Sequence, residues 1–387
     1  MYIQQNPLFS FNELMKYQPK SRLEIIFSKL DLTPVIKALP SKNLVGPNGY
    51  SYKSLIRALL AKTILSIPTF TALVEQLQDN ILLRYVCGFD VIGTTPSVAT
   101  ISRFYAKLAS SEAMSALFYS LVNKAETDGI LQKNIVAIDS SSIASYEHYR
   151  KKEDDGTHAM WGYKKDSKGR DYRWYGYKLH LAVDVESGLP TTFTVTPANT
   201  ADSEQAIPLM ELMKYQPVYY CMDKGYDVIK IYNAVNELGS QAIIPLNKRN
   251  EKTPPEGMNK EHWPVCSMGY PMVYWGAEKE RNSVKFRCPH TCGQKDCYMG
   301  SNWCSSSDFG YSMRLYQKDD PRHINLPYRN TANWKRIYKT RGAVERFFGY
   351  IKENLMAENI HIQGKSKVTT HLLLCCTAAM IINIIMR

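Results

Sequence analysis

The sequence predicts a mixed α/β layer fold that follows a helical N-terminal region. Two short apolar runs, 134–139 and 218–223, each end in an aspartate and are typical of buried strands. Between them, residues 177–196 alternate apolar and polar side chains on both sides of a glycine, which predicts a β-hairpin. The order along the chain is strand, hairpin, helix, strand, helix, strand. This order indicates helices layered on a sheet.

The composition is that of a globular protein with a basic surface. A chain of 387 residues with 44% hydrophobic side chains has room for two or three domains and a sizeable core. The formal net charge is +12, from 48 Lys and Arg against 36 Asp and Glu. Such an excess favours a polyanionic partner, nucleic acid before a membrane surface, although a merely basic surface gives the same charge.

Nothing in the sequence predicts export or a membrane partner. The first residues include neither a basic segment nor an apolar segment of a secretory signal, so we expect a cytoplasmic protein. The most apolar run, 372–386, falls short of the ~20 residues that a bilayer span needs, and we expect a buried core helix there. Nine cysteines in such a chain favour reduced thiols or metal ligands over disulfides.

The N-terminal third is predicted to be helical. The pattern is helical from Tyr52 to Leu108, with breaks at Pro68 and Gly88, and Ser97 can cap a further helix. The inward residues of that further helix would be Ile101, Phe104, Tyr105 and Leu108. The region could contain a helix-turn-helix that offers Ser97, Thr100, Ser102 and Arg103 to a DNA groove. A helical domain used only for packing or dimerisation explains the same pattern.

A basic and aromatic segment lies between the first strand and the hairpin. Its cations are Lys151, Lys152, Lys164, Lys165, Lys168, Arg170 and Arg173, and its rings are Tyr149, Trp161, Tyr163, Tyr172, Trp174 and Tyr175. Cations beside flat rings suit a nucleic-acid backbone and unpaired bases. A solvated, mobile loop is the alternative interpretation.

A segment near the C-terminus, 338–352, is predicted to be an amphipathic helix with a functional polar face. At 3.6 residues per turn, one stripe of the helix consists of Tyr338, Arg341, Glu345 and Lys352. A neighbouring apolar stripe, formed by Val344, Phe347, Phe348, Ile351 and Leu355, would pack on the core. Taken alone, the polar stripe is better explained as a solvated charged face, and only the rest of the chain favours a functional one.

Three carboxylates in this pattern could form a metal site. An aspartate that ends a strand is more often a turn former, but Asp139, Asp223 and Glu345 would act together if the fold brings them together. Hard oxygen ligands of this type bind Mg²⁺ or Mn²⁺. Two such ions about 3.5–4 Å apart would activate a water or a 3′-hydroxyl and stabilise the leaving oxygen. Phosphoryl transfer needs mostly positioning and charge neutralisation.

The sequence resembles the DDE transposases of bacterial insertion sequences, which have an RNase H-like catalytic fold. The resemblance covers about residues 130–360 and, more weakly, 50–110. It rests on the stretches 137–141, 176–184 with 196–202, 223–227 and 338–352. The last stretch matches Y-x2-R-x3-E-x6-K, the signature of the insertion-sequence-four group, at all four letters.

The resemblance implies a site, a reaction and a partner. Asp139, Asp223 and Glu345 would be the catalytic triad that binds Mg²⁺ or Mn²⁺, and Tyr338, Arg341 and Lys352 would hold DNA phosphates at the transposon end. His180 matches a recurrent position of the family, with a structural or a supporting role. The implied reaction is strand cleavage by water, followed by attack of the freed 3′-hydroxyl on target DNA.

The implied partner is double-stranded DNA, both the transposon ends and the target. A dimer would bind this DNA. The expected location is the bacterial cytoplasm, with the protein at the nucleoid when it is bound to DNA. Two other functions remain open at this point. One is a transposase-derived DNA-binding protein without catalysis, and the other is an RNase H-like nuclease without strand transfer.

The stretch 247–330, rich in proline, lysine and cysteine, is predicted to be an inserted subdomain, because a bare RNase H-like core needs fewer residues there. The domains expected are a helical one at 1–125, a catalytic one at 130–246 and 331–387, and the insertion. A structural zinc site could use Cys288, Cys292, Cys297 and Cys304, with His290 and Cys266 nearby. The absence of paired C-x2-C knuckles in the sequence favours unliganded thiols.

Overall fold

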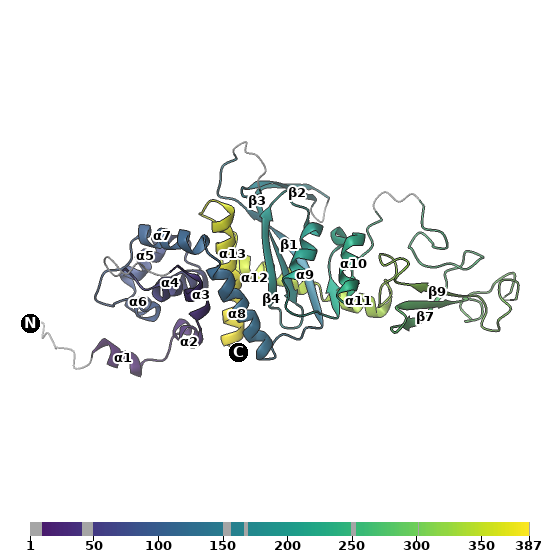
Figure 1. Ribbon diagram of the computed structural model, residues 1–387, viewed down its shortest axis with the longest axis horizontal. Helices are drawn as coiled ribbons and strands as arrows, with labels where there is room; N and C mark the ends of the chain where they lie inside the picture. The colour runs from purple at the N-terminus through teal and green to yellow at the C-terminus, as the bar shows by residue number, and fades with distance from the viewer. Residues whose placement is uncertain are drawn as a thin grey trace, which may run out of the picture. The chain divides into compact units, whose positions relative to one another are not determined.

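The computed structural model describes residues 10–40, 49–149, 156–165, 169–248, 253–300 and 302–386 (Figure 1). The chain divides into two compact units. The first consists of Met1–Asn123, Ile351–His361 and Ser366–Arg387, and the second of Lys124–Tyr350 and Ile362–Lys365. This division assigns most of the C-terminal segment, which we expected with the catalytic domain, to the unit of the N-terminal helices. The domain boundaries stay a prediction.

The first unit is helical, and its local signals follow the sequence. Its helices are α1 (Phe11–Tyr17), α2 (Arg22–Lys29), α3 (Thr33–Ala38), α4 (Tyr52–Ile64), α5 (Phe70–Asp79), α6 (Ile81–Cys87), α7 (Val98–Ala109), most of α8 (Ala113–Thr127) and nearly all of α13 (Lys365–Ile385). Ser97 caps α7 by accepting the Thr100 N–H at 3.2 Å. The predicted inward residues Ile101, Phe104, Tyr105 and Leu108 are buried. The helix-turn-helix stays a prediction.

Helix α13 is longer than its apolar run indicated. It spans 21 residues because the polar residues before Leu372 continue the helix, so the expectation that it is too short for a bilayer was wrong. Its most apolar window has a mean hydropathy of 2.0, and 78% of that window is buried inside the structure. Such burial is typical of a core helix in a soluble protein.

The second unit is built on a six-stranded mixed sheet (Figure 1). Its strands are β1 (Ile135–Ala144), β2 (Met160–Lys165), β3 (Asp171–Asp184), β4 (Pro190–Pro197), β5 (Tyr219–Cys221) and β6 (Gln241–Ile243). The order is β2-β3-β1-β5-β6, and β4 also pairs with β3. Pairing is antiparallel among β1 to β4 and parallel from β1 to β5 and β6. The mixed α/β fold and the β3–β4 hairpin were both predicted.

Two strands differ from the prediction. Strand β1 does not end at Asp139, because its pairing with β3 continues as far as Ala144 opposite Gly176. Asp139 therefore stands inside a strand. The basic and aromatic segment contains a further hairpin, in which β2 pairs with the first half of β3. There the Lys164 ammonium lies 5.4 Å from the centre of the Tyr172 ring. The predicted cations Lys151, Lys152 and Lys168 fall outside the described residues.

Helices cover both faces of the sheet. The helical turns after the hairpin are η1 (Asp202–Gln205), α9 (Ala206–Glu211), η2 (Lys224–Tyr226) and α10 (Ile229–Glu237). Val136 and Ile138 of β1 share one hydrophobic cluster with α9 and α10. Because side chains alternate along a strand, Asp139 points to the opposite face. On that face the Cys221 thiol lies 3.9 Å from the carbonyl oxygen of Ile337, in α11 (Ala332–Lys339).

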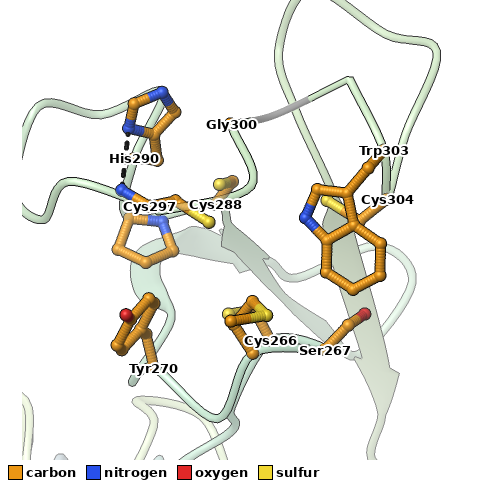
Figure 2. A pocket seen from close by; sticks show the side chains of 11 residues that line it. Cys266, Ser267, Tyr270, Cys288, His290, Cys297, Gly300, Trp303 and Cys304 are labelled. Atoms are coloured by element: carbon orange, nitrogen blue, oxygen red, sulfur yellow. Dashed lines mark hydrogen bonds between the residues drawn. The ribbon is translucent and has the colours of Figure 1, made fainter.

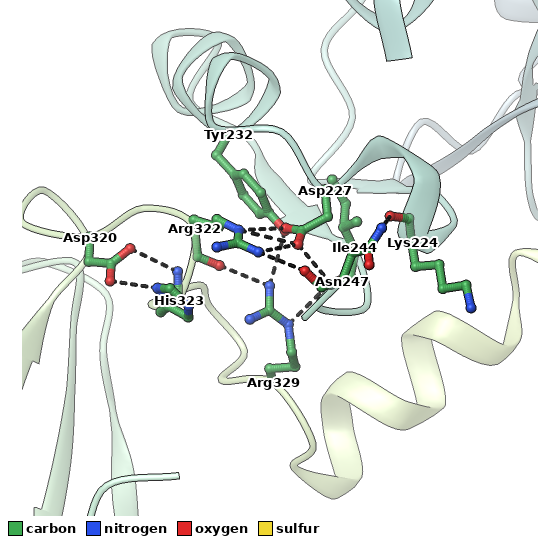
Figure 3. Close-up of polar contacts among 9 residues, drawn as sticks. All are labelled: Lys224, Asp227, Tyr232, Ile244, Asn247, Asp320, Arg322, His323 and Arg329. Carbon is green, nitrogen blue, oxygen red and sulfur yellow. Dashed lines mark hydrogen bonds and ion pairs between the residues drawn. The ribbon is translucent and has the colours of Figure 1, made fainter. Parts of the chain in front are cut away.

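The inserted segment has its own small sheet and core. Strands β7 (Val273–Glu278), β8 (Ser283–Arg287) and β9 (Ser312–Tyr316) pair antiparallel. Their cluster contains Met272, Val284, Phe286, Ile324, Leu326 and Tyr328. A buried ion pair joins the insert to the α10 side of the main sheet, because Arg322 binds the Asp227 carboxylate at 2.9 Å (Figure 3).

Candidate active site

Parallel pairing of β1 and β5 places two acidic residues at the same level of the sheet. Ala137 of β1 lies opposite Cys221, the last residue of β5, and an aspartate follows two residues after each: Asp139 within β1 and Asp223 just after β5. The Asp223 side chain caps η2 by accepting the Gly225 N–H at 2.7 Å. The local turn and the strand register together hold Asp223 beside Asp139.

The Asp139 carboxylate is mostly buried and has an unusual pKa. Its side chain is 19% exposed, and one oxygen accepts the Ser140 N–H at 2.8 Å. Burial raises the pKa of Asp139 to about 6, although the Ser140 N–H and Arg341 both act to lower it. The neighbouring carboxylates of Asp223 and Asp202 raise it further. The ionised carboxylate therefore stands where additional positive charge would stabilise it.

Glu345 lies on α12 (Gly342–Asn354) and is connected to Asp139 through Arg341. One Arg341 nitrogen binds the Asp139 carboxylate at 2.7 Å, and another binds the Glu345 carboxylate. Although burial opposes the charge on Arg341, these two carboxylates outweigh it and raise the pKa of the guanidinium. The structure thus brings Asp139, Arg341 and Glu345 together, whereas the family resemblance assigns Arg341 to DNA phosphates.

The helix that carries these residues is not continuous. The predicted single helix over 338–352 is wrong, because α11 ends at Lys339 and α12 begins at Gly342. Arg341 lies in the turn between them, where its own N–H bonds to the Tyr338 carbonyl at 3.1 Å. The turn directs Arg341 toward Asp139. The apolar stripe of Val344, Phe347, Phe348, Ile351 and Leu355 is buried, as predicted.

The two remaining members of the signature lie on either side of this turn. Tyr338, in α11, stacks on Trp334 with ring centres 5.0 Å apart, and its ring centre is 6.0 Å from the Arg341 guanidinium. Burial raises the pKa of Tyr338. Lys352 lies in the last turn of α12 and binds the Glu358 carboxylate at 2.6 Å.

A fourth carboxylate near Asp139 was missed from the sequence. Asp202 begins η1, and one of its oxygens lies 2.9 Å from the Lys178 ammonium and 4.0 Å from His180 Nδ1. His180 is fully buried, its Nε2 lies 2.8 Å from the Thr196 hydroxyl, and burial lowers its pKa to about 4. His180 is therefore neutral near pH 7. Asp202 is the last residue of the stretch 196–202, one of the stretches on which the family resemblance rests. The resemblance therefore included Asp202 but gave it no role.

The chemistry of the site suits a divalent cation, although the side chains are not arranged as a finished metal site. The donors are carboxylate oxygens, which Mg²⁺ and Mn²⁺ prefer, and like charges raise the pKa of Asp139. Among the described residues, no three Asp, Glu, His or Cys side chains lie close enough to hold an ion. Arg341 forms ion pairs with both Asp139 and Glu345 instead.

A mixed sheet with one carboxylate in β1 and another just after the neighbouring strand β5, beside a helix that carries a third, is typical of an RNase H-like protein. The family model described as "Transposase DDE domain" matches residues 130–381, and "Transposase domain (DUF772)" matches residues 12–107. The chain belongs to the DDE transposases, and it is a DDE transposase enzyme. Proteins of this class generally use divalent metal ions and act on DNA.

Two further comparisons accompany the family match. A solved structure described as a piggyBac transposase synaptic complex with hairpin DNA resembles the chain with a TM-score of 0.40 and 10% identity, over 93% of this chain and 73% of that chain. Comparison with the curated proteins found no match.

Proposed function

We propose that the chain cuts DNA at the ends of its own transposon and joins the freed 3′-ends to target DNA, with Asp139, Asp223 and Glu345 as the catalytic, metal-binding residues. The observation that carries the proposal is the placement of Asp139 and Asp223 two residues beyond the paired residues Ala137 and Cys221 of adjacent parallel strands, with Arg341 linking Asp139 to Glu345. A bound Mg²⁺ or Mn²⁺ would supply activation of the attacking oxygen and neutralisation of the leaving oxygen.

Arg341 is proposed to change partners when the site is loaded. In the described structure its guanidinium is shared between two carboxylates. Once a cation neutralises those carboxylates, the guanidinium is free to bind a DNA phosphate through two parallel hydrogen bonds. Arg341 would thus keep the acidic residues together without metal and hold the scissile strand with metal.

Tyr338 and Lys352 are proposed to contact the phosphates that flank the scissile bond. They share the Y-x2-R-x3-E-x6-K signature with Arg341 and Glu345, which supports membership in the insertion-sequence-four group. The net charge of +12 supports a double-stranded DNA partner. Two ends have to be cut and joined together, so we propose a dimer on DNA, acting inside the cell where its DNA lies.

Cleavage of end-containing DNA by single variants tests the catalytic assignment. Asp139→Asn, Asp223→Asn and Glu345→Gln should each lower the cleavage rate by at least about 10³-fold and still bind end DNA in a gel-shift assay. Glu353→Gln, an exposed change further along α12, is the matched control and should cut at the parental rate. Parental cleavage rates in the three variants would refute the assignment.

Strand transfer is tested separately with pre-cut ends and a supercoiled target. A transposase joins the ends to the target and yields nicked or linear products that contain end DNA. A nuclease of the same fold cuts but yields no joined product, and a binding protein without catalysis gives neither result. The joined product is the outcome that we predict.

A further inference from the structure

Four cysteines from separate segments of the insert line one small cavity (Figure 2). They are Cys266, Cys288, Cys297 and Cys304. The cavity has a volume of about 10 Å³, close to the space of a single water molecule. Cys292 does not line it, although Cys292 is closer in sequence to the other three than Cys266 is. The fold thus brings together a set of four cysteines that differs from the set expected from their spacing in the sequence.

Two of the four thiols stand on the same kind of tight turn. In the turn 266–269, the Gly269 N–H bonds to the Cys266 carbonyl at 2.8 Å. In the turn 297–300, the Gly300 N–H bonds to the Cys297 carbonyl at 3.0 Å. Both glycines have left-handed backbones, with φ of +76° and +69°. Each turn therefore holds a cysteine at its first position.

The lobe from Thr291 to Phe309, which contains Cys297 and Cys304 of these four, lacks a hydrophobic core of its own. Among its described residues from Thr291 to Phe309, none is buried. Its large apolar side chains, Tyr298, Met299 and Phe309, are exposed. The hydrophobic cluster of the insert is built from residues before and after the lobe. Small segments without a core usually need a disulfide or a metal to hold them.

We propose that the insert binds one structural zinc ion through the thiolates of Cys266, Cys288, Cys297 and Cys304. Four sulfur ligands in a closed site are typical of structural zinc, with each bond about 2.3 Å long. The His290 Nδ1 accepts the Cys297 N–H at 3.3 Å and so helps to fix the second turn. This site goes beyond the DNA chemistry proposed above and does not depend on it.

Formation of the site requires a small local change. As the side chains stand, no three donors among the described residues lie at coordinating distance. All four cysteines line the cavity, and the proposal requires rotation of their side chains about the Cα–Cβ bond, with release of the thiol protons as the sulfurs coordinate zinc. The missing C-x2-C pairs are no obstacle, because the ligands come one at a time from separate segments.

Metal analysis of the tag-free, full-length chain, purified under reducing conditions without added metal, tests the site. We expect about one zinc per chain in the parent and in Cys292→Ser, the matched control, and less than about 0.2 in Cys266→Ser and Cys297→Ser. A folded parent without bound zinc would overturn the proposal. So would zinc that is lost from Cys292→Ser and retained by Cys266→Ser.

Cobalt substitution of the unmutated chain decides the question if the serine variants do not fold. Co²⁺ in a tetrahedral four-thiolate site gives intense visible bands and a near-ultraviolet thiolate-to-metal band. These bands should appear with one equivalent of Co²⁺ and disappear with one equivalent of Zn²⁺. A spectrum without a thiolate band would refute the site. Neither spectrum depends on DNA cleavage.

Discussion

Arg341 binds Asp139 at 2.7 Å and holds Glu345 with its other terminal nitrogen, so one guanidinium is shared by two of the three acidic residues that we propose as catalytic. The Arg341 side chain is only 17% exposed, which weakens competition from water. In the proposed mechanism, a cation that binds these carboxylates displaces this guanidinium. The Arg341 guanidinium therefore links the two carboxylates and also competes with a metal ion for them.

Replacing Arg341 should separate metal binding from DNA cleavage. In Arg341→Gln the carboxylates lose their competing cation, so Mn²⁺ should bind at least as tightly as in the parent, measured by calorimetry. End binding should weaken by about tenfold or more, because a charged phosphate contact is lost. Loss of Mn²⁺ binding in this variant, with the fold intact by circular dichroism, would contradict the competitive role.

The raised pKa of Asp139 predicts a pH-dependent stability without added Mg²⁺ or Mn²⁺. A carboxyl whose pKa rises from 3.8 to about 6 on folding contributes stability that is fully present below pH 3.8, and this stability is lost as pH rises through 6. Asp139→Asn removes the effect, so at pH 8 it should be more stable than the parent by up to about 3 kcal/mol. Below pH 4 the two proteins should be equally stable.

Urea unfolding at several pH values measures this difference. Added Mg²⁺ should stabilise the parent at pH 8 and leave Asp139→Asn unchanged, because only the parent retains the complete set of acidic ligands. An Asp139→Asn protein that is less stable than the parent at pH 8 without metal would contradict the account of the buried charge.

Asp202 is predicted to strengthen metal binding from outside the assigned triad. Its carboxylate raises the pKa of Asp139, so Asp202→Asn should weaken Mn²⁺ binding by about threefold to tenfold, less than Asp223→Asn does. Glu204→Gln, an exposed change of the same charge in the same turn, should have no effect. Equal effects of Asp202→Asn and Glu204→Gln on Mn²⁺ binding would contradict a specific role of Asp202, because any nearby negative charge would then have the same effect.

The ion pair between Asp227 and Arg322 is predicted to anchor the insert to the catalytic sheet. Asp227 is fully buried and also accepts the Tyr232 hydroxyl at 2.8 Å and the Asn247 N–H at 2.8 Å. Asp227→Asn leaves Arg322 without its countercharge and should cost about 3–5 kcal/mol. The double change Asp227→Asn with Arg322→Met should cost less than the sum of the single changes.

An exposed pair of similar length is the control for this prediction. Lys124 lies 2.8 Å from Asp128, with both side chains largely in water, so Asp128→Asn should cost less than about 1 kcal/mol in the same urea assay. Although burial opposes the charge of Asp227, its partners lower its pKa. The stabilisation by this carboxylate is therefore present above pH 3.8 and is lost as pH falls below it. Similar losses for the two aspartates would contradict the anchoring role.

Local patterns in the sequence were sufficient for the order of strands and helices in the main sheet, whereas the assignment of the acidic residues needed the family resemblance and stays a prediction. Asp139 and Asp223 each follow an apolar run, and periodicity alone identified the β3–β4 hairpin. The sequence did not predict the extension of β1 to Ala144. The serines after Asp139 resemble a turn, and they continue the strand only because they pair with β3. The break at Arg341 was also hidden, since 3.6-residue periodicity continues across a single turn.

Residues that meet through long-range folding could not be placed from the sequence. Asp202 approaches Asp139 only because β3 and β4 pair and return the chain to the same part of the sheet. Cys266 joins Cys288 at one cavity because a turn before β7 and the end of β8 lie together, and no spacing rule predicts that contact. Both cases depend on tertiary contacts between segments that are distant in sequence.

The convergence of Asp139, Asp223 and Glu345 on one cation is the central claim, and iron-directed cleavage of the polypeptide tests it most directly. Fe²⁺ replaces Mg²⁺ at the site, and with ascorbate and peroxide it generates radicals that cut the backbone next to the bound ion. The account predicts cuts near all three residues, mapped by mass spectrometry and suppressed by excess Mg²⁺. Cuts confined to one of the three positions, or located elsewhere in the chain, would contradict it.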